Sequence, residues 1–365
     1  MSKLGKYLLW ALAAAVAVFI VWRFSNIVAY ILASAVLAIV GKPLVEAIQR
    51  IHIKKFHPPK WLAALLTLIV MWVVVILFFT FFIPLVFGKL SELARLDIPY
   101  IINSFREPLQ SFQDWIVRTF AVADPDFSVT EQIGAFISEK FDPTKLLGIF
   151  TSTVSSAAST AVAIFSITFI TFFFLKEDGL FRHMVVSLFP KKFENNILHA
   201  IDSATGLLMR YFTGILAEST IMFILLSCAF LLWGFNPQTA FFMGFIVGVL
   251  NVIPYVGPII SGCICLIVGV LSPLAGYTAF EMALTVVGTV LLIQGVDNFV
   301  LQPYLYSKRV KAHPLEIFIV ILVAGSIGGI IGMLLAIPAY TVLRVFAKEF
   351  LNNYRIVQEL TRKID

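Results

Sequence analysis

Two acidic residues stand inside apolar stretches of the sequence, where an ionised carboxylate is costly and by default marks a functional site. Glu218 lies about seven residues into the apolar run that begins at Tyr211, and Asp297 lies near the end of a later run. A coupling-ion or solute-pathway role fits both carboxyls. The structural alternative is a hydrogen bond within the helix bundle for Glu218, and a helix cap or an ion pair with Lys308 or Arg309 for Asp297.

Amide side chains accompany the two carboxyls. Gln294, Asn298 and Gln302 surround Asp297 in the sequence, and Asn251 follows a different apolar run. Their oxygens and N–H groups suit a polyol or a sodium ion, although each amide could instead satisfy a neighbouring backbone group. These residues predict a polar site at the ends of apolar helices.

Two backbone features extend this predicted site. Pro254 has no N–H to donate, so it leaves carbonyl groups upstream without their helical partner. Ser326 lies in the glycine-rich stretch 325–329, where the backbone can approach a ligand closely. The complete predicted pathway set is Glu218, Asn251, Pro254, Gln294, Asp297, Asn298, Gln302 and Ser326.

An intramembrane enzyme is the competing class of function. Gly325-Ser-Ile-Gly328 resembles a serine nucleophile loop, but no histidine falls within an apolar run to act as its base. The His-Glu-x-x-His metal motif does not occur, and the three cysteines lie in apolar runs without metal or disulfide spacing. We therefore expect no enzyme activity, no catalytic residue, no metal and no cofactor.

The composition indicates a membrane protein. Of the 365 residues, 60% are hydrophobic and 13% are charged, against about 45–50% and about 25% in an ordinary soluble domain. Several apolar runs exceed the roughly 18 residues that a spanning helix needs, and they are continuous rather than alternating. The net charge of +6 is spread over many loops, so we expect no nucleic-acid partner.

The pattern divides the chain into five predicted segments. N-terminal transmembrane helices occupy 1–87, and an external amphipathic helical segment occupies 88–145. A long transmembrane helix with cytoplasmic amphipathic helices follows over 146–210. A transport core occupies 211–343, and a cytoplasmic C-terminal helix occupies 344–365.

Loop charge sets the predicted orientation, because short cytoplasmic loops carry an excess of Lys and Arg. The loops 42–60 and 302–314 are basic, and together with 176–210 they are predicted to be cytoplasmic. The acidic segment 88–145 is predicted to be external, either packed on the membrane or on a neighbouring subunit, or acting as a lid. Both chain termini are then cytoplasmic.

Two apolar segments are too broken to cross the membrane. The arms 239–252 and 259–271 each have about 13 residues, or roughly 20 Å of helix, against a hydrocarbon core about 30 Å thick. The segment 315–343 begins and ends beside cytoplasmic basic residues and is interrupted at 325–329. Each segment is predicted to be a re-entrant helical hairpin, with the polar site near the membrane centre between the two tips.

The hairpins and two spans form a predicted inverted repeat. The span 211–233 precedes the first hairpin and starts from the inside, whereas 282–301 precedes the second and starts from the outside. Transporters are often built from such inverted units. The predicted fold is all-α: a polytopic membrane protein with about six spanning helices plus two re-entrant helical hairpins.

The sequence resembles the autoinducer-2 exporter family, also called the PerM-like permeases, over nearly the whole chain. The motifs that carry the resemblance are Asn251-Val-Ile-Pro-Tyr-Val-Gly-Pro258, Asp297-Asn298 with Gln302-Pro303, His313-Pro314, and Gly332-Met-Leu-Leu-Ala-Ile-Pro338. The resemblance implies a bacterial inner-membrane transporter with re-entrant hairpins, an elevator-like mechanism and a homo-oligomer, expected to be a pentamer.

The predicted function is a carrier that exports a small polar solute, such as an autoinducer-2-like signal molecule, with coupling to an ion left open. The alternatives are a sodium/proton antiporter and a passive channel. The expected partners are a small polar solute or a monovalent cation, the lipid bilayer and further copies of this chain.

Overall fold

The structure is a computed structural model, and its described residues contain helices, turns and no strand, which confirms the all-α class. Described are residues 19, 23–50, 58–93, 110, 113–114, 117, 157–177, 179–187, 189–272, 274–306 and 313–351. The predicted helix at the N-terminus, nearly all of the predicted external segment and the basic stretch 307–312 lie outside them. Among the described helices, four are long and apolar enough to cross a membrane: Ser25–Arg50, Lys60–Lys89, Lys191–Leu232 and Ala279–Leu305.

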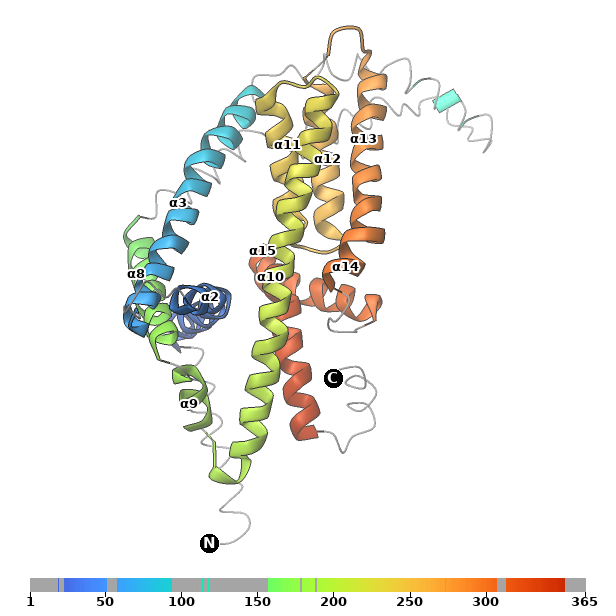
Figure 1. The fold of residues 1–365 in the computed structure, drawn as a ribbon. Coiled ribbons are helices and arrows are strands. Elements are labelled where there is room, and N and C mark those ends of the chain that lie inside the picture. Colours follow the sequence, from blue (N-terminus) through green and yellow to red (C-terminus); the bar gives the residue numbers. More distant parts are fainter. Residues whose placement is uncertain are drawn as a thin grey trace. The chain divides into compact units, whose positions relative to one another are not determined.

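The helices follow one another along the chain as labelled in Figure 1. They are α2 (Ser25–Arg50), α3 (Lys60–Leu93), α8 (Ala157–Lys176), α9 (Leu180–Ser187), α10 (Glu194–Leu232), α11 (Pro237–Leu250), α12 (Val256–Val270), α13 (Ala279–Val296), α14 (Gln302–Tyr306) and α15 (Pro314–Leu351). The chain divides into two compact units. Unit 1 comprises 1–75, 156–209 and 344–361, and unit 2 comprises the rest.

Unit 1 is built on close contact between α2 and α8. Gly41 of α2 makes this approach possible, because a Cβ there would lie 3.2 Å from the Met71 sulfur and 3.4 Å from Leu175. Two hydrogen bonds add to the packing: the Ser34 hydroxyl donates to the Ile167 carbonyl at 3.1 Å, and the Trp72 indole donates to Thr168 at 3.2 Å. The buried residues of this core are Val45, Ala63, Ala64, Leu68 and Leu175.

Helix α2 is longer than predicted. The sequence places a loop after Val40, but the helix continues through Lys42 and Pro43 to Arg50. The reason is packing: Val45 and Ile48 carry the apolar stripe of α2 onward and lie in the core of unit 1. The apolar residues of α2 therefore keep a helical spacing beyond Val40, where the continuous apolar run ends.

The α9–α10 region breaks at Phe189–Pro190, and a short 3-10 turn at Lys191–Phe193 follows. From Glu194 the chain forms one helix of 39 residues. The predicted surface helix before 210 and the predicted span from 211 are therefore one continuous helix, and the division between units 1 and 2 falls within it, between residues 209 and 210.

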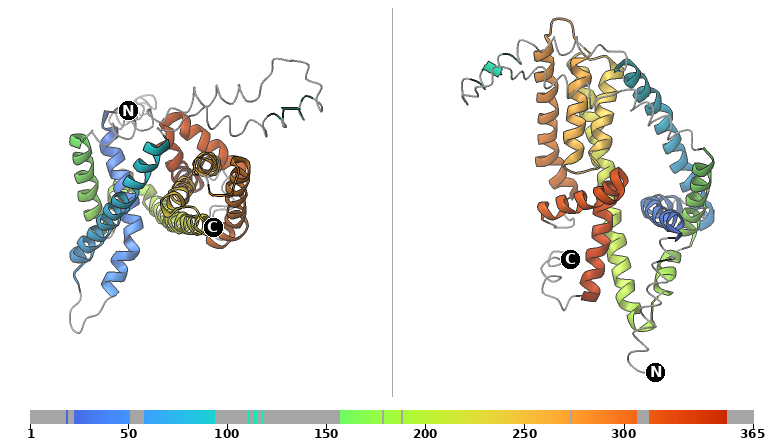
Figure 2. Two further views of the ribbon diagram at one scale, coloured as in Figure 1. Left: turned by 90° about the horizontal axis from the view of Figure 1, so that it is seen from above. Right: turned by 180° about the vertical axis from the view of Figure 1, so that it is seen from behind.

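Unit 2 is organised around α11, α12, α13 and the part of α10 that follows residue 210, which lie side by side in Figures 1 and 2. Small residues bring the helices together: a Cβ at Gly248 of α11 would lie 2.7 Å from the Ser219 carbonyl of α10. At one end the Trp233 indole donates to Thr289 of α13 at 3.0 Å. Fully buried residues of this core include Met222, Leu226, Phe230, Phe242, Met243, Cys265, Val268, Met282 and Val286.

The end of α3 belongs to unit 2, and hydrogen bonds from a buried lysine hold it there. Lys89 is 1% exposed, although the sequence places it in the external segment. Its ammonium group donates to Glu92 at 2.8 Å, to Thr239 of α11 at 3.1 Å and to Ser272 after α12 at 2.8 Å. All three N–H groups are used, so the charge is compensated and the end of α3 is tied to both arms of the first hairpin.

The helices α11 and α12 form the first hairpin, close to the predicted limits of its arms. Gly257 lies against the Leu250 carbonyl where the chain turns back. The second hairpin is α15, which is two helices separated at Gly329, with φ 57° and ψ −140°. Gly332 lies against the Ala324 carbonyl, although eight residues of straight helix would separate them by about 12 Å.

The two hairpins contact each other within unit 2. Ile253 and Val256 of the first pack against Ile321 and Ala336 of the second. A ring contact between Tyr255 and Phe318, with centroids 5.9 Å apart, lies at the same junction. The two turns are therefore joined by an apolar contact.

Candidate functional site

Asp297 lies where α13 changes register. The residues Asp297–Leu301 form a π-helical segment, in which the Gln302 N–H donates to the Asp297 carbonyl five residues earlier. Pro303 explains the change, because it has no N–H for the Phe299 carbonyl and its ring opposes a continuous α-helix. Such π segments occur frequently at functional sites, since they turn side chains away from the regular helical pattern.

The Asp297 carboxyl is completely buried, with 0% exposure, and its partners are neutral amides. Its Oδ2 accepts hydrogen bonds from Gln302 Nε2 at 3.0 Å and from Gln294 Nε2 at 3.3 Å. Gln302 also donates to Asn298 Oδ1 at 3.2 Å. The helical turns before and after Asp297 therefore supply Gln294 and Gln302, whose amides orient its carboxyl.

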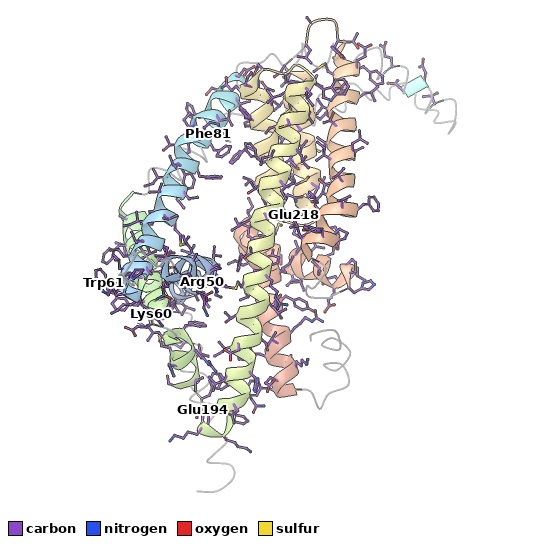
Figure 3. All side chains as sticks on the ribbon, viewed as in Figure 1. Arg50, Lys60, Trp61, Phe81, Glu194 and Glu218 are labelled. Carbon is purple, nitrogen blue, oxygen red and sulfur yellow. The ribbon has the colours of Figure 1, made fainter. Side chains whose placement is uncertain are left out.

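A second carboxyl reaches the same place from α10. Glu218, labelled on α10 in Figure 3, is buried with 4% exposure, and its Oε1 accepts a hydrogen bond of 3.2 Å from Asn251 Nδ2. Glu218 and Asn251 are both in hydrogen-bonding contact with the Asp297 side chain. We refer to Glu218, Asn251, Gln294, Asp297 and Gln302 as the Asp297 cluster.

Asn251 is positioned by the turn of the first hairpin. It caps the end of α11 through its own N–H, which donates to the Val247 carbonyl, and it is 7% exposed. The turn that follows is strained at Tyr255, with φ 65° and ψ −53°. The Val256 N–H donates to the Pro254 carbonyl at 2.7 Å, so Tyr255 is the centre of a rare γ-turn with positive φ. Strain of this kind occurs preferentially at functional sites.

The structure does not bring every predicted pathway residue to the cluster. Ser326 of α15 is exposed, and its hydroxyl donates to the Val323 carbonyl at 2.8 Å within its own helix. Asn298 is exposed and touches the cluster only through Gln302. Pro254 contributes through the γ-turn backbone. The predicted site therefore has its polar side chains around the first hairpin, with the second hairpin in apolar contact beside it.

Two features of the site are not predicted from the sequence. The strained Tyr255 follows directly after Pro254, and no residue type at that position signals a positive φ. The π segment had a usable signal, because Pro303 follows Asp297 by less than two helical turns. Within the described residues, no group of three or more His, Cys, Asp or Glu side chains is placed to hold a metal ion.

Comparison of the sequence with known proteins identifies its family. The sequence model described as AI-2E family transporter matches residues 8–352. The chain is 32% identical over 199 residues to the Bacillus subtilis protein YueF, a match covering 54% of this chain and half of YueF. It is 26% identical over 325 residues to the AI-2 transport protein TqsA of Escherichia coli, covering 87% of this chain and 84% of TqsA.

A second Bacillus subtilis protein, YrrI, is 32% identical over 189 residues, which again span half of its length. The family match, in contrast, extends over nearly the whole chain and includes every residue of the Asp297 cluster. The apolar helices agree with a protein that spans a membrane. The chain belongs to the AI-2E family of membrane transporters.

Proposed function

We propose that this protein is a carrier that exports a small polar solute, such as an autoinducer-2-like molecule, across the bacterial inner membrane with coupling to an ion gradient. The name of TqsA motivates the solute class. The observation that carries the proposal is the meeting of two buried carboxyls with the amides of three side chains at two breaks in apolar helices. In a membrane such a polar centre is costly unless it serves binding.

The local backbone supports a carrier with an enclosed site. Asn251 lies at the turn between α11 and α12, and Asp297 lies at the π segment, so both sit where helical hydrogen bonding is interrupted. Transporter sites are typically formed at such interruptions, because the freed backbone groups add to the side-chain ligands. Both carboxyls are at least 96% buried, which favours a closed binding site over an open channel.

We further propose how the chain is arranged around this site. The hairpins α11–α12 and α15 are re-entrant, and the core 211–343 moves by an elevator-like mechanism within a homo-oligomer. The short arms support this proposal, since α11 has 14 residues and α12 has 15, or roughly 20 Å each. Such arms can reach the centre of a bilayer but cannot cross it.

Flux through proteoliposomes tests the carrier. Asp297→Asn removes the charge and keeps the size of the side chain, so solute efflux driven by an ion gradient should fall at least tenfold. Asp297→Ala should be more severe, because Gln294 and Gln302 then lose their acceptor. Glu177→Gln, which changes an exposed carboxyl in unit 1, should transport normally and serves as the control.

The protein level and assembly of each variant must match the wild type by size-exclusion chromatography. Normal, saturable flux through both Asp297 variants would show that Asp297 is only a structural cap. Flux that rises linearly with solute and ignores ion gradients would replace the carrier by a channel.

A sodium/proton antiporter is the second candidate, and the contact between two carboxyls favours it. Adjacent carboxyls repel when both are ionised, so a proton or a cation must reside between or beside them. Vesicles that contain a pH-sensitive dye would separate the two functions. Proton movement on adding sodium without any organic solute supports the antiporter, whereas proton movement that needs the solute supports the coupled carrier.

A further inference from the structure

A pocket lies within unit 1, lined by residues of α2, α8, α9 and the first turns of α10. Its volume is about 710 Å³, which is in the range of sites for small molecules. Every lining residue belongs to unit 1, and none belongs to the Asp297 cluster. We call it the unit 1 pocket, and its lining includes Ala38, Lys42, Glu46, Leu175, Arg182 and Asp202.

The walls of the unit 1 pocket combine apolar and charged residues from different parts of the chain. Ala35 and Ile39 of α2 and Phe174 of α8 come from apolar runs. The charged lining residues all come from the segments 42–60 and 176–210, which are both predicted to be cytoplasmic. The pocket therefore joins apolar membrane helices to polar segments, and this combination suits an amphiphilic ligand.

The charges that line the pocket are balanced. With His183 neutral, three basic and three acidic side chains contribute: Lys42, Lys60, Arg182, Glu46, Glu194 and Asp202. A purely anionic or purely cationic ligand would meet as much repulsion as attraction in this set. A ligand that carries both signs can place each charge beside an opposite one.

Lys42 and Glu46 offer one charge of each sign to such a ligand. They lie one turn apart on α2, and in the part of the chain that the structure describes neither forms an ion pair. A lysine that precedes a glutamate by four residues is the less favourable order for a pair on one helix. Both side chains are therefore available to a ligand in the pocket.

Arg182 adds a donor that lacks an acceptor. Its Nη2 pairs with Asp202 at 3.1 Å, whereas its Nε–H is buried and has no hydrogen-bond partner. A buried donor without an acceptor costs free energy. A negatively charged oxygen of a ligand would remove that cost, and arginine binds phosphate oxygens with well-matched geometry.

The surface next to the pocket has the character of a segment that lies on a membrane. Helix α9 buries none of its residues, and the large apolar side chains of Met184, Phe189 and Phe193 are exposed. Lys191 and Lys192 lie between the two phenylalanines in the sequence. Exposed apolar side chains beside lysines are typical of helices at the membrane interface. This surface favours a ligand that enters the pocket from the bilayer.

We propose that the unit 1 pocket binds a zwitterionic phospholipid of the cytoplasmic leaflet, one whose headgroup joins a phosphate to a primary amine. The phosphate lies beside Lys42 and Arg182, the amine lies beside Glu46, and the acyl chains follow the apolar walls of α2 and α8. A phospholipid without an amine leaves Glu46 unpaired and brings a further negative charge. The site is independent of the proposed carrier, because it shares no residue with the Asp297 cluster.

Native mass spectrometry of the purified full-length protein tests the proposal. The protein in detergent receives an equimolar mixture of phosphatidylethanolamine and phosphatidylglycerol with equal acyl chains, one of them deuterated to separate the masses. The lipids that survive collisional activation are then counted. We expect phosphatidylethanolamine to exceed phosphatidylglycerol about fivefold, the size of effect expected for one partly exposed charge pair. Equal retention, or an excess of phosphatidylglycerol, would contradict the proposal.

Two variants should change lipid retention in different ways. Lys42→Gln should lower the retention of both lipids, because both carry a phosphate. Glu46→Gln should abolish the preference for phosphatidylethanolamine, because it removes the partner of the amine and leaves positive charge in excess. Arg182→Gln should act like Lys42→Gln, and circular dichroism checks that each variant is folded. Lys191→Gln, at an exposed lysine outside the pocket, provides the control.

A change in the ratio of the two lipids is not expected from a general loss of structure. A Glu46→Gln protein that keeps the wild-type ratio would therefore overturn the assignment of the amine. Wild-type retention in both Lys42→Gln and Arg182→Gln would show that the retained lipids lie elsewhere on the protein.

A soluble form of the headgroup separates a lipid from a water-soluble phosphate compound. Glycerophosphoethanolamine and dioctanoyl phosphatidylethanolamine are each titrated against delipidated protein, and the Tm is measured. The lipid should act at a concentration roughly tenfold lower or more, because only its chains contact the apolar walls. Equal half-saturating concentrations would assign the pocket to a soluble ligand and overturn the lipid site.

Discussion

At the scale of single residues, Asn251 is the link between the two carboxyls. Its amide donates to Glu218 and its side chain also contacts Asp297, so one neutral group orients two acids that come from different helices. A neutral amide can do this without cancelling the negative charge of the site. An arginine or lysine at the same place would cancel part of that charge.

Asn251→Ala should therefore reduce the affinity for the transported ligand roughly 10- to 150-fold, because a hydrogen bond to a charged group contributes about 1.5–3 kcal/mol. Asn251→Asp should be worse, since a third carboxyl enters the cluster. Concentration-dependent flux measures both effects as a rise in KM. A variant Asn251→Ala with unchanged KM would show that the hydrogen bond from the Asn251 amide to Glu218 contributes nothing to ligand binding.

At the scale of elements, the second hairpin depends on one backbone conformation. Gly329 has φ 57° and ψ −140°, which L-residues rarely adopt, although a Cβ there would meet no atom within 4 Å. Its neighbour Gly328 also has open space for a Cβ and has no positive φ. A Cβ has open space at both positions, so a comparison of the two glycines tests the backbone strain at Gly329 alone.

Gly329→Ala should lower the free energy of unfolding by about 1–3 kcal/mol through backbone strain. Gly328→Ala should be neutral or slightly stabilising, because alanine favours helix over glycine by about 1 kcal/mol. Thermal unfolding in nanodiscs compares the pair. Equal Tm values for the two variants would contradict the described turn at Gly329.

The first hairpin is held at its other end by Lys89. Lys89→Met leaves a side chain of similar length but removes three hydrogen bonds, so Thr239 and Ser272 lose their donor. We expect faster amide exchange at 237–240 and 269–272, measured by mass spectrometry, and a lower Tm. Lys192→Met, at an exposed lysine, provides the control. Unchanged amide exchange in Lys89→Met would mean that apolar packing alone holds this end of the first hairpin in place.

Much of this arrangement follows from sequence patterns, and the exceptions have physical reasons. The hairpin arms can be predicted because their apolar runs are short. Glu218 and Asp297 can be predicted as site residues because carboxyls in apolar runs are rare. The burial of Lys89 does not follow from the sequence, because its partners Thr239 and Ser272 are distant from it along the chain. The contact between Glu218 and Asp297 is equally non-local and depends on the packing of α10 against α13.

At the scale of the whole molecule, orientation in the membrane is the property that loop charge predicts. Single cysteines in a background without Cys228, Cys263 and Cys265 test it. An impermeant reagent applied to intact cells should label Tyr277→Cys, in the loop before α13, and Asp126→Cys. It should label Glu177→Cys only after the cells are opened. The reverse pattern would invert the predicted topology.

The hydrogen bond from Trp233, directly after α10, to Thr289 connects α10, which carries Glu218, with α13, which Asp297 directly follows. The sequence has six tryptophans, so replacing Trp10, Trp22, Trp61, Trp72 and Trp115 by phenylalanine leaves a single indole at this junction. The wavelength of its fluorescence maximum depends on whether the indole N–H is hydrogen-bonded. Trp233 is therefore an intrinsic fluorescent probe, and stopped-flow mixing with salt or solute would measure the rate at which α10 and α13 separate.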